Sequence, residues 1–95
     1  MITLNLSKHC IQTEVKRLHN RCISRYFKDR GNRSALEREL LLLTDALNTF
    51  DFAWLRGQYP ELSGGHSASV VLERGASKKL LVRINGRVIR TDPDG

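Results

Sequence analysis

Four basic side chains in the first third of the sequence are spaced so that one helix would align them. Separated by four, four and three positions, they are Arg17, Arg21, Arg25 and Lys28. On a helix they form one stripe, with neighbouring charges about 6 Å apart along the axis. A row of cations at this spacing suits a nucleic-acid backbone or an acidic protein surface. The stripe therefore predicts a polyanion-binding surface, and a solvated helix face without a partner is the competing interpretation.

Two further arginines lie in the last third, in a segment predicted to be a hairpin. Arg83 and Arg90 are predicted on its outer face, with Lys79 and Arg87 close by. They would enlarge the polyanion surface if this face and the basic helix lay on one side of the molecule. In the competing interpretation, cations on solvent-facing strands only discourage association through sheet edges.

Aromatic side chains gather between the helical and the sheet segments, at Phe52, Trp54 and Tyr59. Because Trp and Tyr are favoured at protein interfaces, this group predicts a patch for protein interaction. A small satellite core over one end of the helices is the alternative.

No residue pattern points to a reaction or to a bound cofactor. The sequence has no nucleophile-elbow, phosphate-loop or dinucleotide-binding motif. His19 and Cys22, three residues apart, would share a helix face, but no second pair follows at zinc-site spacing. We therefore expect no catalytic residue, no metal site and no cofactor, and we favour a protein that is not an enzyme.

The charge is strongly positive and unevenly distributed. The 95 residues include sixteen Lys and Arg and ten Asp and Glu, which gives a formal net charge of +6. Residues 1–34 carry eight basic and two acidic side chains, residues 35–62 two and five, and residues 63–95 six and three. Such a balance favours nucleic acid or an acidic protein as the partner.

Length and hydropathy predict a single cytoplasmic domain with no membrane partner. No apolar stretch is long enough to span a bilayer, and the first ten residues lack the pattern of a secretory signal. Cys10 and Cys22 would lie too far apart on one helix to form a disulfide, which fits a reducing compartment. An exposed edge strand leaves a homodimer open.

The first 62 residues are predicted to be mainly helical after an N-terminal strand. Residues 2–6 alternate between apolar and polar side chains, as in a strand with one buried face. Ser7 is the expected N-cap of a helix that ends near residues 29–31. A second helix is expected to start at Ser34, because Ser34 and Glu37 have capping-box spacing. In residues 51–62 we expect a short helical turn, ended by Gly57 and Pro60.

Residues 66–91 are predicted to form an antiparallel sheet, followed by an acidic tail at residues 92–95. Asn85 and Gly86 supply the two positive φ angles of a type I′ turn, which would pair Ile84 with Arg87 and Val82 with Ile89. A further strand is expected at residues 68–72, with a turn after it. The prediction is an α+β fold: a strand, two packed antiparallel helices, a short helical turn and a three-stranded antiparallel β-meander (β-α-α-β-β-β).

The predicted run of three strands comes from residues 69–75, 79–85 and 87–91, after a strand and two helices. This element order, on a basic chain of this size, resembles the RelE/ParE type of small bacterial toxins over most of the chain. In that family, basic residues of the sheet bind mRNA for ribosome-dependent cleavage, or the protein poisons gyrase. The resemblance implies that Arg83 and Arg90, with His66, would act on RNA.

Three functions follow as hypotheses. The leading one is a non-enzymatic binding protein, such as a bacterial mobile-element or phage accessory factor, whose basic helix stripe binds nucleic acid or an acidic protein. The second is a RelE/ParE-like toxin acting on mRNA or gyrase. The third is a protein-interaction module that uses the aromatic patch.

Overall fold

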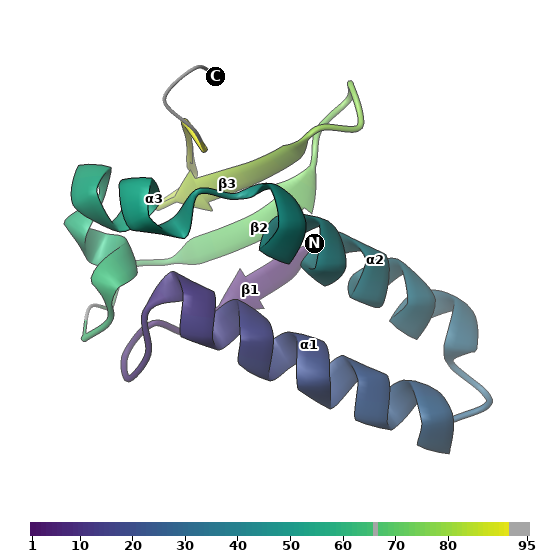
Figure 1. Cartoon of the computed structure of the whole chain (residues 1–95). Helices are drawn as coiled ribbons and strands as arrows, with labels where there is room; N and C mark the ends of the chain where they lie inside the picture. The colour runs from purple at the N-terminus through teal and green to yellow at the C-terminus, as the bar shows by residue number, and fades with distance from the viewer. Residues whose placement is uncertain (66, 92–95) are drawn as a thin grey trace.

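The chain has the α+β architecture that its sequence predicted (Figure 1). The computed structural model describes residues 1–65 and 67–91. His66 and the acidic tail at residues 92–95 lie outside this described part. The elements are β1 (Ile2–Leu4), α1 (Ile11–Lys28), α2 (Arg33–Thr49), α3 (Phe52–Gln58), the 3-10 turn η1 (Pro60–Ser63), β2 (Val70–Arg74), β3 (Leu80–Ile84) and β4 (Arg87–Ile89).

The four strands form one antiparallel sheet in the order β1-β2-β3-β4. The N-terminal strand joins the predicted meander along β2, where Ile2 lies opposite Leu72 and Leu4 opposite Val70. The predicted three-stranded meander, β2 to β4, is therefore part of a four-stranded sheet whose edges are β1 and β4. Strand β1 precedes the helices in the sequence and the meander follows them, but all four strands belong to one sheet.

The Asn-Gly turn forms as predicted. Asn85 and Gly86 have φ angles of 53° and 84°, and β3 and β4 pair in the expected register, with Val82 opposite Ile89. The prediction for β2 was wrong by two residues, because Glu73 and Arg74 continue the strand. The turn is instead closed further on, where the Gly75 N–H donates to the Lys79 carbonyl at 2.9 Å.

Both predicted helix caps were wrong. Ser7 donates to the Asn5 side chain, and α1 begins only after Cys10, which makes no side-chain capping bond. Helix α2 begins at Arg33, so Ser34 lies inside its first turn and forms no capping box with the glutamate three residues on. Ser7 is thus used within the preceding loop, whereas Ser34 is displaced from the cap because α2 begins one residue earlier.

The predicted short turn between the helices and the sheet contains two elements. Helix α3 continues through Gly57, which therefore does not end it, and Pro60 begins η1. Asp51 caps α3 by accepting from the Trp54 N–H at 3.1 Å. An aspartate N-cap satisfies a backbone donor that would otherwise lack a partner.

The hydrophobic core lies between the helices and one face of the sheet. Helices α1 and α2 pack side by side as an antiparallel hairpin, which is the longest part of the molecule in Figure 1. Val15 and Leu43 from these helices and Leu72 and Val82 from the sheet are buried. Cys22 of α1, also buried, donates its thiol to the Leu36 carbonyl of α2 at 3.2 Å. No helix in the described part of the chain is long and apolar enough to cross a membrane.

The other face of the sheet is open to solvent. The register places Thr3, Val71, Arg83 and Val88 side by side across the four strands, and each is half-buried or exposed. Because alternate residues of a strand point to opposite faces, these side chains cannot share a surface with the helices on the inner face.

Candidate nucleic-acid interface

The structure divides the predicted basic stripe of α1, because Arg17 already has an acidic partner. Its Nε and Nη2 donate to the two carboxylate oxygens of Glu14 at 2.8 and 3.1 Å. Glu14 is only 1% exposed and also accepts from the Asn5 N–H at 3.0 Å. Glu14 therefore connects the residues after β1 to α1, and Arg17 stabilises the charge of this carboxylate. The Arg17 guanidinium is thus not free to bind a ligand.

The environment of Glu14 keeps it ionised. The hydrogen bonds from the Arg17 guanidinium lower the pKa of Glu14 below its ordinary value, and the Asn5 N–H adds to this effect against the opposing effect of burial. A buried carboxylate is expensive unless it is paired and hydrogen-bonded, as this one is. The i,i+3 spacing of the pair was visible in the sequence, but the burial of Glu14 was not.

The rest of the stripe is exposed and unpaired. Arg21, Arg25 and Lys28 form no ion pair with any residue that the structure describes. Arg21 and Arg25 line a small hollow of about 120 Å³ together with Glu39 of α2, but this carboxylate does not pair with either of them. The described part of the chain thus leaves these three cations available to a partner.

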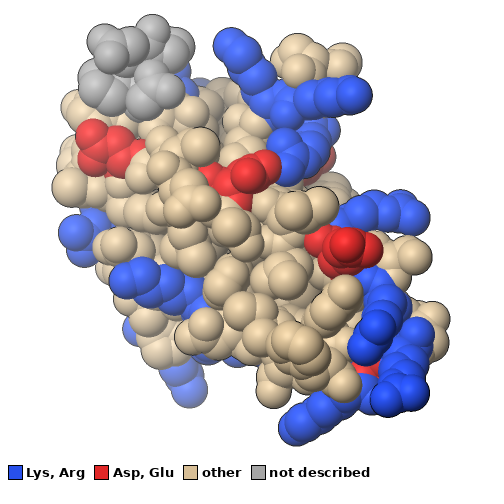
Figure 2. Space-filling view, turned by 45° about the vertical axis from the view of Figure 1, so that its right-hand side comes forward, with Lys and Arg blue, Asp and Glu red and all other residues tan. Residues whose placement is uncertain are grey.

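Two cations from the loop and from α2 join the stripe where the helical hairpin turns. Arg30 and Arg33 are exposed and, within the described ranges, also make no ion pair. Figure 2 shows Lys and Arg side chains gathered over this end of the hairpin, at the lower right. We call residues 25–33 the hairpin end; with Arg21 one turn further back, they provide five cations against one acid.

The acid, Asp29, is hydrogen-bonded within the loop and lies near enough to the Arg25 charge to feel it, although the two form no ion pair. Its carboxylate accepts from the Gly31 N–H at 3.1 Å and from the Asn32 side-chain amide at 2.9 Å. The hydrogen bond from Asn32 and those from the backbone lower the pKa of Asp29. The carboxylate therefore fixes the short connection that brings the end of α1 to the start of α2.

The hairpin end also carries an aromatic cluster that the sequence analysis missed. Phe27 is 71% exposed and meets Tyr26 nearly edge to face, with ring centroids 5.6 Å apart. The Arg33 guanidinium lies 5.2 Å from the Tyr26 centroid, within range of a cation–π interaction. Apolar spacing along α1 directs Tyr26 toward the core, against which it packs, and gives Phe27 no role. The position of Phe27 next to Lys28 was the signal available in the sequence.

The predicted sheet cations do not join this surface. Arg83 lies on the solvent-facing side of the sheet and forms an ion pair with Glu73 of β2. Its Nη1 also donates to the Gly86 carbonyl at 3.3 Å. Arg90 follows β4, and its backbone N–H donates to the Tyr59 hydroxyl at 3.2 Å. The helical and sheet cations therefore occupy separate surfaces.

The predicted aromatic patch is divided between core and surface. Phe52 is only 7% exposed and packs edge to face with Phe50, so it belongs to the core. Trp54 and Tyr59 are half-buried and also meet edge to face, with centroids 6.4 Å apart. Tyr59 uses its hydroxyl to hold the chain after β4.

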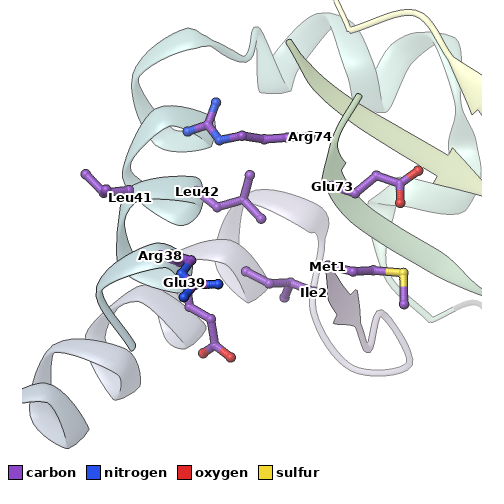
Figure 3. A pocket seen from close by; sticks show the side chains of 8 residues that line it. All are labelled: Met1, Ile2, Arg38, Glu39, Leu41, Leu42, Glu73 and Arg74. Atoms are coloured by element: carbon purple, nitrogen blue, oxygen red, sulfur yellow. The ribbon is translucent and has the colours of Figure 1, made fainter. Parts of the chain in front are cut away.

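A separate, mainly apolar pocket of about 440 Å³ lies between α2 and the β1–β2 edge of the sheet (Figure 3). Its lining residues are Met1, Ile2, Arg38, Glu39, Leu41, Leu42, Glu73 and Arg74. Arg74 spans from β2 to α2 through its ion pair with Asp45. This pocket is wide open to solvent and can hold apolar groups. Its lining residues include no nucleophile beside a base, so it is not a candidate catalytic site.

The part of the chain that the structure describes gives little support for a metal site or for a disulfide. No three His, Cys, Asp or Glu side chains there are placed to hold a metal ion. Cys10 and Cys22 are both free thiols. Burial raises the pKa of Cys22, whereas the Thr13 hydrogen bonds lower that of Cys10 despite its partial burial.

Residues 1–83 match the model of a protein family. The chain belongs to this family. The matched region runs from β1 into β3 and includes the entire hairpin end, whereas Arg90 lies beyond it. No curated protein and no solved structure matches the chain.

Proposed function

We propose that this protein is a cytoplasmic, non-enzymatic nucleic-acid-binding protein that contacts phosphates through its helical hairpin. The cations concerned are Arg21, Arg25, Lys28, Arg30 and Arg33. The observation that carries the proposal is that these five side chains lie at one end of the helical hairpin and form no ion pair with any described residue. Arg17, Arg74 and Arg83, in contrast, are each paired with a carboxylate.

Electrostatics favours a phosphate partner at this position. Like charges three or four residues apart on a helix destabilise it by a few tenths of a kcal/mol per pair. A polyanion relieves that repulsion and releases its own counterions, so binding through such a surface weakens steeply as salt rises. An acidic protein would also be attracted, because a guanidinium can donate two parallel hydrogen bonds to a carboxylate as well as to a phosphate. A nucleic-acid strand differs in presenting a regular row of anions, which suits a row of several cations.

The test is binding of the purified protein to labelled single-stranded DNA, RNA and duplex DNA between 50 and 300 mM salt. In the Arg21→Glu/Arg25→Glu variant, we expect affinity at 100 mM salt to fall by at least about 25-fold, since each phosphate contact contributes about 5-fold there. The matched control, Lys79→Glu/Arg87→Glu, makes the same charge change at exposed positions in the β2–β3 turn and in β4. An equal loss in both variants would contradict a local site.

Other outcomes distinguish the remaining functions. Binding of an acidic protein, with no nucleic acid bound at 50 mM salt, would replace the proposed ligand but keep the surface. Growth arrest on expression, abolished by Arg83→Gln, would favour a toxin of the RelE/ParE type. In the structure, however, the Arg83 guanidinium is occupied by Glu73 and the Gly86 carbonyl.

A further inference from the structure

We propose that the hairpin end binds single-stranded nucleic acid by stacking one base on Phe27 while the neighbouring cations hold the flanking phosphates. This inference rests on the proposed function and specifies its ligand. The observations that carry it are an aromatic ring, 71% exposed, and cations without an ion pair at the same end of the helical hairpin. Isolated exposed apolar residues are common on protein surfaces, so the surroundings of Phe27 carry the argument.

The Phe27 side chain is mostly exposed and contacts one neighbouring aromatic ring. Tyr26 is the aromatic side chain that packs on it in the described part of the chain, and the two rings are inclined at 82°. Tyr26 is itself half-buried and covered by the Arg33 guanidinium. Tyr26 is therefore held by its own contacts, while most of the Phe27 side chain remains accessible to a planar group.

Cations that could meet the phosphates of a stacked nucleotide lie at the same end of the hairpin as Phe27. Lys28 follows Phe27 directly, and Arg30 lies in the connecting loop. Arg33 is joined to Phe27 through the Tyr26 ring, at 5.2 and 5.6 Å for the two successive contacts. A base bound on Phe27 has a phosphate on each side along its strand, so cations around the ring can meet both.

This arrangement favours a single strand over a duplex. The bases of a duplex stack on one another and offer only their edges to a protein, whereas an unpaired strand exposes base faces to aromatic side chains. Stacking tolerates every base, because each has a π-face. The expected preference is therefore for strandedness and not for sequence.

The experiment compares Phe27→Leu and Phe27→Trp with the native protein, by fluorescence anisotropy on a labelled 12-nucleotide strand and on the duplex of the same sequence. Phe27→Leu keeps an apolar side chain but removes the stacking surface. We expect it to weaken single-strand binding by about 5- to 150-fold, the equivalent of about 1 to 3 kcal/mol per stacked base. Phe27→Trp should bind the strand at least as tightly as the native protein.

The salt dependence separates stacking from charge. Phe27→Leu should leave the slope of log K against log salt unchanged, whereas Arg25→Gln/Lys28→Gln should reduce it by about 1.4, or 0.7 for each lost phosphate contact. Leu41→Ala, at an apolar side chain that is 58% exposed but away from the hairpin end, is the matched control and should bind normally. Because Phe27 is exposed, thermal unfolding of its variants should match that of the native protein.

Each result decides between the two proposals. If Arg25→Gln/Lys28→Gln weakens binding but Phe27→Leu does not, the stacking proposal is overturned and the nucleic-acid function stands. An equal loss from Phe27→Leu on strand and duplex also overturns it. If the native protein binds neither ligand at 50 mM salt, both proposals fail.

Discussion

The hairpin end and the solvent-facing side of the sheet are both basic, but their cations differ in what surrounds them. On the solvent-facing side of the sheet, Arg83 of β3 is paired with Glu73 of β2, and at the end of β2, toward the helices, Arg74 is paired with Asp45 of α2. At the hairpin end, the one carboxylate is occupied by its own loop. The difference teaches that local charge pairing, and not net charge, separates a surface built for stability from one that can take a polyanion.

The largest expected difference in nucleic-acid affinity is between a variant that loses two unpaired cations and a variant that loses two paired cations. Arg25→Gln/Lys28→Gln should weaken nucleic-acid binding by about 25-fold at 100 mM salt, since each contact contributes about 5-fold. Arg74→Gln/Arg83→Gln removes the same charge and should change affinity by less than about 3-fold. Equal effects would show that overall charge, and not pairing, decides binding.

The buried ion pair of α1 should matter for stability. Glu14→Ala removes the acceptor for Arg17 and for the Asn5 N–H, and hydrogen bonds to a charged group contribute about 1.5 to 3 kcal/mol. We expect the free energy of unfolding, measured with urea, to fall by about that amount. Glu37→Ala, at an exposed position of α2, is the control and should change it by less than about 0.5 kcal/mol. A similar small change in both variants would contradict the structural role of Glu14.

The same residue predicts how stability depends on pH. The pKa of Glu14 is lowered in the folded protein, so its contribution is present above the unfolded value of about 4.3 and is lost as the pH falls through the folded value. Urea unfolding between pH 2.5 and 7 should therefore show a difference between native protein and Glu14→Gln that shrinks below about pH 4. A difference that stays constant with pH would rule out this linkage.

Breaking an ion pair on the sheet should have the smallest effect. Glu73→Gln frees Arg83, but the pair is partly exposed, and exposed pairs contribute only about 0 to 1 kcal/mol. We expect a correspondingly small loss in the free energy of unfolding and no gain in nucleic-acid affinity. If the freed Arg83 made binding markedly tighter, the sheet would be a latent second surface.

Local chemistry explains which parts of the fold the sequence could predict. Asn85 and Gly86 determine their turn by their own backbone preferences, so the β3–β4 register follows directly. Ser7 and Ser34 failed as caps because α1 begins four residues after Ser7, whose side chain bonds Asn5, and α2 begins one residue before Ser34. The attachment of β1 to β2 depends on tertiary pairing, which no local pattern reports.

The candidate site was predictable only in part for a related reason. Helical spacing placed Arg21, Arg25 and Lys28 on one stripe, and they remain unpaired in the described structure. The same spacing included Arg17, whose role depends on how deeply Glu14 is buried. Phe27 was overlooked because hydrophobic periodicity identifies the residues that face the core and says nothing of an aromatic ring left outside it.

The pairing of β1 with β2 has a consequence for the order in which the chain folds. Ile2 and Leu72 are about 70 residues apart, whereas α1 and α2 are joined by a short loop. Contacts between distant residues form late because the loop must close before they stabilise anything. During synthesis, the helical hairpin can therefore assemble before β2, β3 and β4 have been made. Strand β1 is made before the hairpin, but it can pair with β2 only after the hairpin is complete.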